Sequence, residues 1–101
     1  PVLFFEHKAL YRSVSGPVPH DYYEIEIGKA RHVVEGDEIS IITYGSGVHW
    51  AEEYAAEHPG MSIDLLDLRT LLPLDYLAIR QSVQRTGRVL ILRVIRYSYS
   101  F

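Results

Sequence analysis

The sequence lacks cysteine, long apolar runs and any excess of positive charge. With no cysteine, it can form no disulfide framework, thiol nucleophile or thiolate metal site. No apolar run approaches the roughly 20 residues of a membrane-spanning helix. The formal net charge is -3, so no basic field attracts nucleic acid or anionic lipid. We therefore expect no nucleic-acid partner and no membrane association, and a reducing compartment fits the absence of cysteine.

The start of the chain also lacks familiar signals. It begins Pro-Val-Leu-Phe-Phe-Glu, without an initiator methionine, a charged leader or a cleavage pattern. We interpret it as a piece of something longer. At 101 residues and 48% hydrophobic composition, it can form one domain at most, with a small core.

The most informative stretch is residues 62–75, which read Ser-Ile-Asp-Leu-Leu-Asp-Leu-Arg-Thr-Leu-Leu-Pro-Leu-Asp. The nearly continuous apolar run predicts a strand buried on both faces of a parallel sheet. Asp75 then predicts the cap of a helix with a buried stripe of Tyr76, Ile79 and Val83, and Gly87 is suited to end that helix. Residues 89–92 predict a further strand.

A similar unit precedes this stretch. Residues 38–44 are β-branched and apolar, and they run into Gly45-Ser46-Gly47. From Val48 onward the helical period predicts about three turns, with Ser46 as the cap and an end at residues 59–60. Strand, helix, strand, helix and strand with short joints predict an α/β fold. We expect three layers, in which helices cover both faces of a mostly parallel sheet.

The first third of the chain gives weaker signals. Residues 1–5 suit a buried strand, and residues 13–21 are rich in turn formers. Alternation over residues 22–27 predicts a half-buried edge strand. Residues 30–34 suit another short extended piece.

No motif predicts a catalytic centre. The turn Gly45-Ser46-Gly47 can present backbone amides to a phosphate, but the full dinucleotide fingerprint is absent, and a tight turn is the favoured interpretation. None of the histidines share metal-ligand spacing on one helix face, which argues against a metal site; they are His7, His20, His32, His49 and His58. No serine has the context of a nucleophile elbow.

Two charged residues follow predicted strands, where functional groups of parallel sheets often lie. Glu6 can serve chemistry, yet a salt bridge or a cap is the favoured role. Arg69 can clamp an anion in bidentate fashion or join two domains or subunits, and we favour the structural role. The residues alone thus predict an α/β fragment with an interaction surface.

Five motifs stand out when the chain is taken as a whole. They are Pro-Val-Leu-Phe-Phe-Glu-His-Lys-Ala-Leu-Tyr-Arg at 1–12, Ile-Gly-Lys-Ala at 27–30, Tyr-Gly-Ser-Gly-Val-His at 44–49, Asp-Leu-Arg-Thr-Leu-Leu-Pro-Leu-Asp at 67–75 and Ser-Val-Gln-Arg-Thr-Gly-Arg at 82–88. Together they resemble one family, the beta subunit of the thiamine diphosphate-dependent decarboxylase of 2-oxo acid dehydrogenase complexes. The resemblance extends from residue 1 to about residue 92, and the Phe-Phe-Glu-His-Lys-Ala-Leu-Tyr-Arg form is similar to the branched-chain (2-oxoisovalerate) type.

The resemblance implies a division of the chain. Residues 1–12 would end the pyrimidine-binding domain with its last strand, residues 13–36 would link the domains, and residues 37–101 would begin the transketolase C-terminal domain. The family's catalytic glutamate and cation-binding loop lie upstream of residue 1. The resemblance therefore implies no catalytic, cofactor-binding or metal-binding residue in this chain, although the parent enzyme would use thiamine diphosphate and a divalent cation.

The implied role is assembly rather than chemistry, and we expect the isolated chain to be inactive. The assembly or structural candidates are Glu6, Arg69, Thr70, Pro73 and Asp75. The implied partners are an alpha subunit, a second beta subunit and the dihydrolipoyl acyltransferase core. The implied location is the cytoplasm of a bacterium, or the mitochondrial matrix in a eukaryote.

The ending departs from the family. Residues 93–101, Arg-Val-Ile-Arg-Tyr-Ser-Tyr-Ser-Phe, replace an acidic segment and a glycine-rich loop, as foreign sequence after a reading-frame change would. We expect self-association through an exposed sheet edge and this aromatic tail. Two other interpretations stay open: a free-standing α/β module that binds an anion at residues 45–47, and another thiamine enzyme of the transketolase superfamily.

Overall fold

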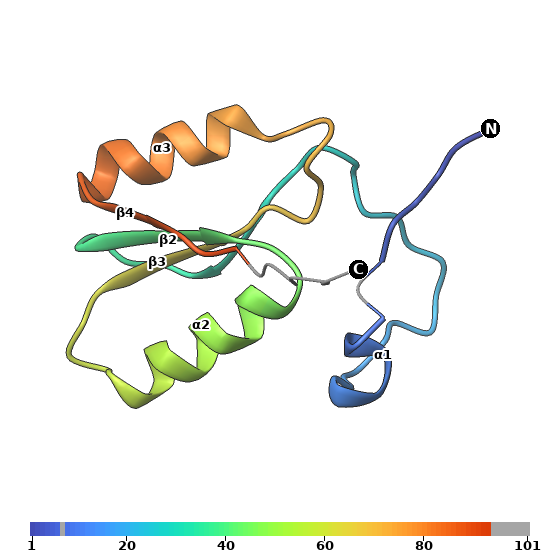
Figure 1. Cartoon of the computed structure of the whole chain (residues 1–101), viewed down its shortest axis with the longest axis horizontal. Helices are drawn as coiled ribbons and strands as arrows, with labels where there is room; N and C mark the ends of the chain where they lie inside the picture. Colours follow the sequence, from blue (N-terminus) through green and yellow to red (C-terminus); the bar gives the residue numbers. More distant parts are fainter. Residues whose placement is uncertain (7, 94–101) are drawn as a thin grey trace, which may run out of the picture.

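A computed structural model describes residues 1–6 and 8–93. The four strands form one sheet in the order β1-β3-β2-β4. α2 covers one face of this sheet and α3 covers the other, and the N-terminal third lies to one side (Figure 1). The elements are α1 (Leu10–Ser13), β1 (Arg31–Val34), β2 (Ile39–Thr43), α2 (Ser46–Glu57), β3 (Ile63–Asp67), α3 (Tyr76–Thr86) and β4 (Val89–Ile91).

The sheet is mostly parallel, as predicted. β2 pairs in parallel with β3 and with β4, whereas β1 pairs antiparallel with β3. The connection from β2 to β3 runs toward one edge and that from β3 to β4 toward the other. Because parallel crossovers are right-handed, the two connecting helices must lie on opposite faces. The predicted three-layer α/β architecture is confirmed.

Alternating side chains of the central strands make two core layers. On the α2 face the buried cluster is Ile41, Ala51, Ile63 and Leu65. On the α3 face Ile42, Leu66 and Leu68 pack with Ile79 and Val83. β3 is therefore buried on both faces, as its apolar run predicts.

The helices α2 and α3 are capped differently. Asp75 accepts a hydrogen bond from the Ala78 N–H at 3.1 Å and so caps α3, while Gly87 ends it with φ 70. Both predictions are confirmed. Ser46 as the cap of α2 is wrong, because Gly45 takes that position with φ 58 and Ser46 is the first helical residue. Tyr76 is also misassigned, since it is 74% exposed.

Two predicted strands of the first third do not form here. Residues 1–5 lie in no strand and are exposed, with Phe4 at 77% and Phe5 at 89%. Residues 22–27 form no strand either, and Tyr23 and Ile25 are 51% and 54% exposed. A strand needs a partner, and none of the described strands pairs with either segment. The division into domains at residues 12 and 36 stays a prediction.

Candidate functional site

The edge strand β4 exposes apolar side chains along its whole length. The sheet order places it at one end, beside β2 alone. Val89, Leu90 and Ile91 are 46%, 48% and 73% exposed. Natural edge strands are usually protected by charges, proline or a bulge. β4 carries none of these within Val89–Ile91, so it is an open template for another strand.

A groove runs along β4 on the α2 face. Its wall on α2 is Trp50 and Tyr54, and its floor includes Ile41 and Leu90. Trp50 is 53% exposed and Tyr54 is 43% exposed, so aromatic surface faces the solvent here. The volume is about 390 Å³. Its remaining lining is Ile39, Ala51, Met61 and Leu92.

A second groove, of about 290 Å³, follows β4 on the α3 face. Its lining includes Ile42, Leu68, Ile79 and the half-exposed Leu71. Ile91 and Arg93 close it on the strand side. Both grooves are within or near the size of small-molecule clefts, but such clefts also hold converging polar groups that orient a ligand. The apolar linings here suit a protein segment better.

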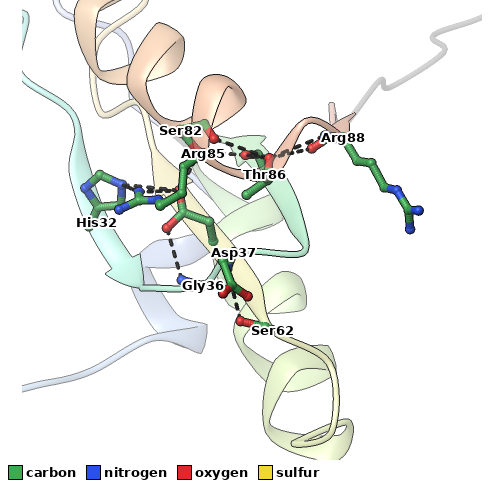
Figure 2. A network of polar contacts seen from close by, with 10 residues as sticks. His32, Gly36, Asp37, Ser62, Ser82, Arg85, Thr86 and Arg88 are labelled. Carbon is green, nitrogen blue, oxygen red and sulfur yellow. Dashed lines mark hydrogen bonds and ion pairs between the residues drawn. The ribbon is translucent and has the colours of Figure 1, made fainter.

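The buried polar cluster centres on Asp64, a fully buried residue and the second of β3. Its Oδ2 accepts hydrogen bonds from Ser82 and from Arg85 Nη2, the latter at 3.0 Å. Its Oδ1 accepts from the Gly36 N–H at 3.2 Å, and His32 Nε2 lies 3.4 Å from Oδ2. Figure 2 shows these contacts converging from α3, β1 and the turn after β1. The carboxylate joins three elements to the central strand.

A second set of hydroxyls extends the cluster towards β4. Ser40 on β2 shares hydrogen bonds with Ser82 at 2.7 Å and with Thr86 at 2.6 Å. Thr86 in turn donates to the Arg88 carbonyl at 2.9 Å, just before β4 begins (Figure 2). The described residues leave no buried side-chain polar atom unpaired. The cluster therefore stabilises α3 on the sheet and fixes the start of β4.

The electrostatics of the cluster favour an ionised Asp64. Burial by itself would raise the pKa of this carboxyl, but the hydrogen bonds from Ser82, Gly36 and Arg85 and the nearby His32 outweigh it. The pKa of Asp64 therefore lies below its ordinary value. Because Asp64 and Ser82 are 0% exposed, no substrate reaches them. The arrangement is structural and not catalytic.

The loop after β3 holds the other predicted structural residues. Arg69 has a φ of 57, and its N–H bonds to the Asp67 carboxylate at 2.9 Å. Asp75 also accepts from the Ala30 N–H at 2.9 Å, so the cap of α3 ties down the segment before β1. The hydrogen bonds from Ala30 and Ala78 lower the pKa of Asp75.

Pro73 and Thr70 complete this loop. Pro73 lies against Gly28, where an added Cβ would meet its Cγ at 2.9 Å. Thr70 is half-buried beside the exposed Arg69. Arg69, Thr70, Pro73 and Asp75 thus share the segment between β3 and α3, while Glu6 lies in the N-terminal third and accepts a hydrogen bond from Tyr11. The assembly role of all five stays a prediction.

The glycine turn has a packing explanation. A Cβ at Gly47 would lie 2.1 Å from Thr43 Oγ1. The same Thr43 hydroxyl donates to the Leu92 carbonyl at 2.8 Å. Gly47 is thus needed for close contact between α2 and the end of β2, and no observation here favours an anion site. Across residues 1–6 and 8–93, no cluster of potential metal ligands occurs and no helix has the length and hydropathy to cross a bilayer.

The sequence prediction missed the Asp64 cluster. The signal for it was the Asp64 carboxylate itself, since a charge within a strand buried on both faces requires partners. Those partners, His32, Ser82 and Arg85, are 18 to 32 residues away in the chain. The sheet edge that was predicted to be exposed is exposed along β4. Its use as an interaction surface stays a prediction, and the part of that prediction involving residues 94–101 lies outside the described residues.

Residues 28–97 match the family model of the transketolase C-terminal domain. The chain is 50% identical over 93 residues to the 2-oxoisovalerate dehydrogenase subunit beta of Bacillus subtilis (strain 168), an alignment covering 90% of this chain and 28% of that protein. It is 46% identical over 95 residues to the pyruvate dehydrogenase E1 component subunit beta of the same organism, covering 92% and 29%. The chain therefore spans less than a third of these relatives.

A solved structure gives the same fold. It is the split gene transketolase described as an inactive beta4 tetramer, with a TM-score of 0.62 and 26% sequence identity. The match covers 73% of this chain and 26% of that one.

Proposed function

The chain belongs to the transketolase C-terminal domain family, and from this premise we propose that it is an assembly part of the beta subunit of a branched-chain 2-oxo acid dehydrogenase. The observation that carries the proposal is the 50% identity over 93 residues to a 2-oxoisovalerate dehydrogenase beta subunit. The pyruvate dehydrogenase relative, at 46% identity, is slightly more distant. The parent reaction would be oxidative decarboxylation of a branched-chain 2-oxo acid with acyl transfer to a lipoyl group.

The exposed surfaces support assembly rather than chemistry as the role of this part. The central carboxylate, Asp64, is enclosed and fully hydrogen-bonded. The accessible features are instead apolar: the edge of β4, its two grooves, and residues such as Leu72 at 92% exposure and Leu77 at 60%. Exposed apolar surface of this extent is characteristic of an interaction face.

The partners and cofactors of the proposal belong to the parent enzyme. They are an alpha subunit, a second beta subunit, the dihydrolipoyl acyltransferase core, thiamine diphosphate and a divalent cation. The chain itself is proposed to hold neither cofactor, and to self-associate through its sheet edge. The proposal places the parent enzyme in the cytoplasm of a bacterium.

A chimera tests the assembly role. Residues 1–93 would replace the aligned segment of the Bacillus subtilis 2-oxoisovalerate dehydrogenase beta subunit, and the product would be co-expressed with the alpha subunit. We expect an assembled complex that decarboxylates 3-methyl-2-oxobutanoate with the host's substrate preference. A chimera that folds but does not bind the alpha subunit would contradict the proposal.

The isolated chain provides the complementary measurement. We expect no thiamine diphosphate-dependent release of carbon dioxide from 3-methyl-2-oxobutanoate or pyruvate, with the host beta and alpha subunits together as the positive control. Turnover by the 101-residue chain alone would overturn the claim that this part serves assembly only.

A further inference from the structure

We propose that Asp64 sets the direction of a chain of hydrogen bonds that crosses the sheet and ends at the start of β4. This relay passes from the Asp64 carboxylate through the hydroxyl groups of Ser82, Ser40 and Thr86 to the Arg88 carbonyl. Asp64 is a positioning residue in it, because it acts on β4 through other side chains. The inference goes beyond the assembly role proposed above and does not depend on it, since it concerns a coupling within one chain.

The number of protons limits how the relay can be arranged. Asp64, Ser40 and Ser82 are each 0% exposed, so water cannot replace their partners, and Thr86 is half-buried. Each hydroxyl has one proton and can donate only once. Two hydroxyl oxygens in close contact therefore need the proton of one or the other between them.

An ionised carboxylate fixes the direction of every later bond. The pKa of Asp64 lies below its ordinary value, so at neutral pH this group accepts and cannot donate, and Ser82 must give it its proton. The contact between Ser82 Oγ and Ser40 Oγ, at 2.7 Å, then needs the Ser40 proton. The contact between Ser40 Oγ and Thr86 Oγ1, at 2.6 Å, needs the Thr86 proton in turn. All three hydroxyls therefore point towards Asp64.

Thr86, at the far end, has one proton for three acceptors. They are Ser40 Oγ at 2.6 Å, the Arg88 carbonyl oxygen at 2.9 Å and the Ser82 carbonyl oxygen at 3.2 Å. The ionised relay favours the shortest contact, so the Arg88 carbonyl receives the smaller share of a divided hydrogen bond. The Ser40 N–H also donates to this carbonyl, at 2.8 Å. While Asp64 is charged, the backbone therefore supplies most of the attachment at the start of β4.

An amide at position 64 would reverse the relay. In Asp64→Asn the NH₂ group must face either the Gly36 N–H, which bonds to Oδ1 at 3.2 Å, or the Ser82 hydroxyl, which bonds to Oδ2. The Gly36 N–H belongs to the backbone and cannot turn, whereas the hydroxyl can rotate. Arg85 and His32 also lie against Oδ2, but their side chains are 44% and 32% exposed and can turn to solvent. The NH₂ group therefore takes the Oδ2 position and donates to Ser82.

Reversal moves the Thr86 proton to β4. Ser82 then donates to Ser40, Ser40 donates to Thr86, and Thr86 donates to the Arg88 carbonyl. Every contact between two oxygens keeps one proton, so the reversed relay is as complete as the original. Figure 2 shows Thr86 between Ser82 and Arg88, at the last link of the relay. The hydrogen bonding of the Arg88 carbonyl therefore reports the direction of the relay.

NMR of the isotope-labelled 101-residue chain measures this directly. A carbonyl carbon signal moves downfield when its oxygen accepts a stronger hydrogen bond. We expect Asp64→Asn to move the Arg88 carbonyl signal downfield relative to the unmodified chain. The Leu92 carbonyl is the internal control, because it accepts from Thr43, which is not part of the relay, at 2.8 Å. Its signal should stay unchanged.

Ser82→Ala tests the same step with the charge retained. It leaves Asp64 as a carboxylate but removes the acceptor of the Ser40 proton, so Ser40 is free to donate to Thr86. The Arg88 carbonyl signal should again move downfield. Ser82 lies within α3, where alanine is favourable, so this variant decides the matter even if Asp64→Asn does not fold.

The Thr86 hydroxyl provides the matched control. In the Thr86→Val background the relay has no last donor, so adding Ser82→Ala should leave the Arg88 signal where Thr86→Val alone puts it. Thr86→Ser keeps a hydroxyl and should keep the response to Ser82→Ala. An Arg88 signal that does not move in Ser82→Ala, a response that persists in the Thr86→Val background, or an equal movement at Leu92 would each overturn the inference.

Discussion

β3 and β4 flank the same strand, β2, and both are parallel to it, yet their surroundings are opposite. Leu65 and Leu66 of β3 are 0% exposed, whereas Leu90 of β4 is 48% exposed. The two strands are similarly apolar, so composition does not explain the difference. β3 has a strand on each side and a helix on each face, whereas β4 has a partner on one side only among the strands of residues 1–6 and 8–93. Burial is thus a property of the neighbours and not of the strand.

The largest expected effect is in the core of β3. Leu65→Ala should lower the free energy of unfolding by about 3 to 5 kcal/mol, because it removes buried methyl groups and leaves a cavity. Urea denaturation followed by circular dichroism measures the change. If Leu65→Ala lowered the free energy of unfolding as little as Leu90→Ala in β4 is expected to, the contrast in burial between the two strands would be contradicted.

Asp64→Ala should cost about 2 to 4 kcal/mol, because it leaves the Gly36 N–H and the Ser82 hydroxyl without their acceptor and removes the partner of Arg85. Arg85 is partly exposed, with its side chain at 44%, so water recovers some of its interaction. The same denaturation experiment applies, with Asp37→Ala in the exposed turn as the control. Equal effects of the two substitutions would contradict the anchoring role of Asp64.

Gly47→Ala should cost about 1 to 3 kcal/mol by overpacking against Thr43, the residue whose hydroxyl holds the end of β4 through the Leu92 carbonyl. Gly60→Ala is the matched control, because no atom lies within 4 Å of a Cβ there. Thr43→Ala combined with Gly47→Ala should remove the clash and show a coupling between the two sites. Additive effects would argue that this contact does not limit the attachment of β4.

Lowering the pH should gradually reduce the stability that the Asp64 cluster contributes. The pKa of Asp64 is lower in the folded chain than its ordinary value of 3.8, so its contribution to stability is complete above that value. The contribution is lost as the pH falls from there through the folded pKa. Denaturation midpoints across this acid range should fall more steeply for the unmodified chain than for Asp64→Asn. Parallel curves would show that Asp64 is not stabilised as a carboxylate.

Leu90→Ala should have the smallest effect, less than about 1 kcal/mol on the unfolding of the monomer, because half of the side chain is already in water. Measurement at low protein concentration separates monomer stability from pairing. A loss comparable to that of Leu65→Ala would mean that β4 is buried as deeply as β3, contrary to the structure.

The elements with a strong local signal were predicted well. The strand at β3, the cap at Asp75 and the end of α3 at Gly87 each depend on residues within one turn or strand, so local chemistry determines them. Residues 1–5 and 22–27 were predicted as strands because alternation and apolar runs are necessary for a strand but not sufficient. A strand also needs a partner, and none of the described strands pairs with them.

The sequence by itself determined the order of strands and helices from residue 38 onward, the cap at Asp75, the end of α3 at Gly87, the three-layer class and the resemblance to a beta-subunit family. All of these follow from patterns within a few residues or from motifs in a fixed order. Only the tertiary structure decided that Asp64 is enclosed by His32, Ser82 and Arg85, that Tyr76 is exposed, and that β4 is an open edge between two apolar grooves. These features depend on which distant segments meet, and that is set when the sheet forms.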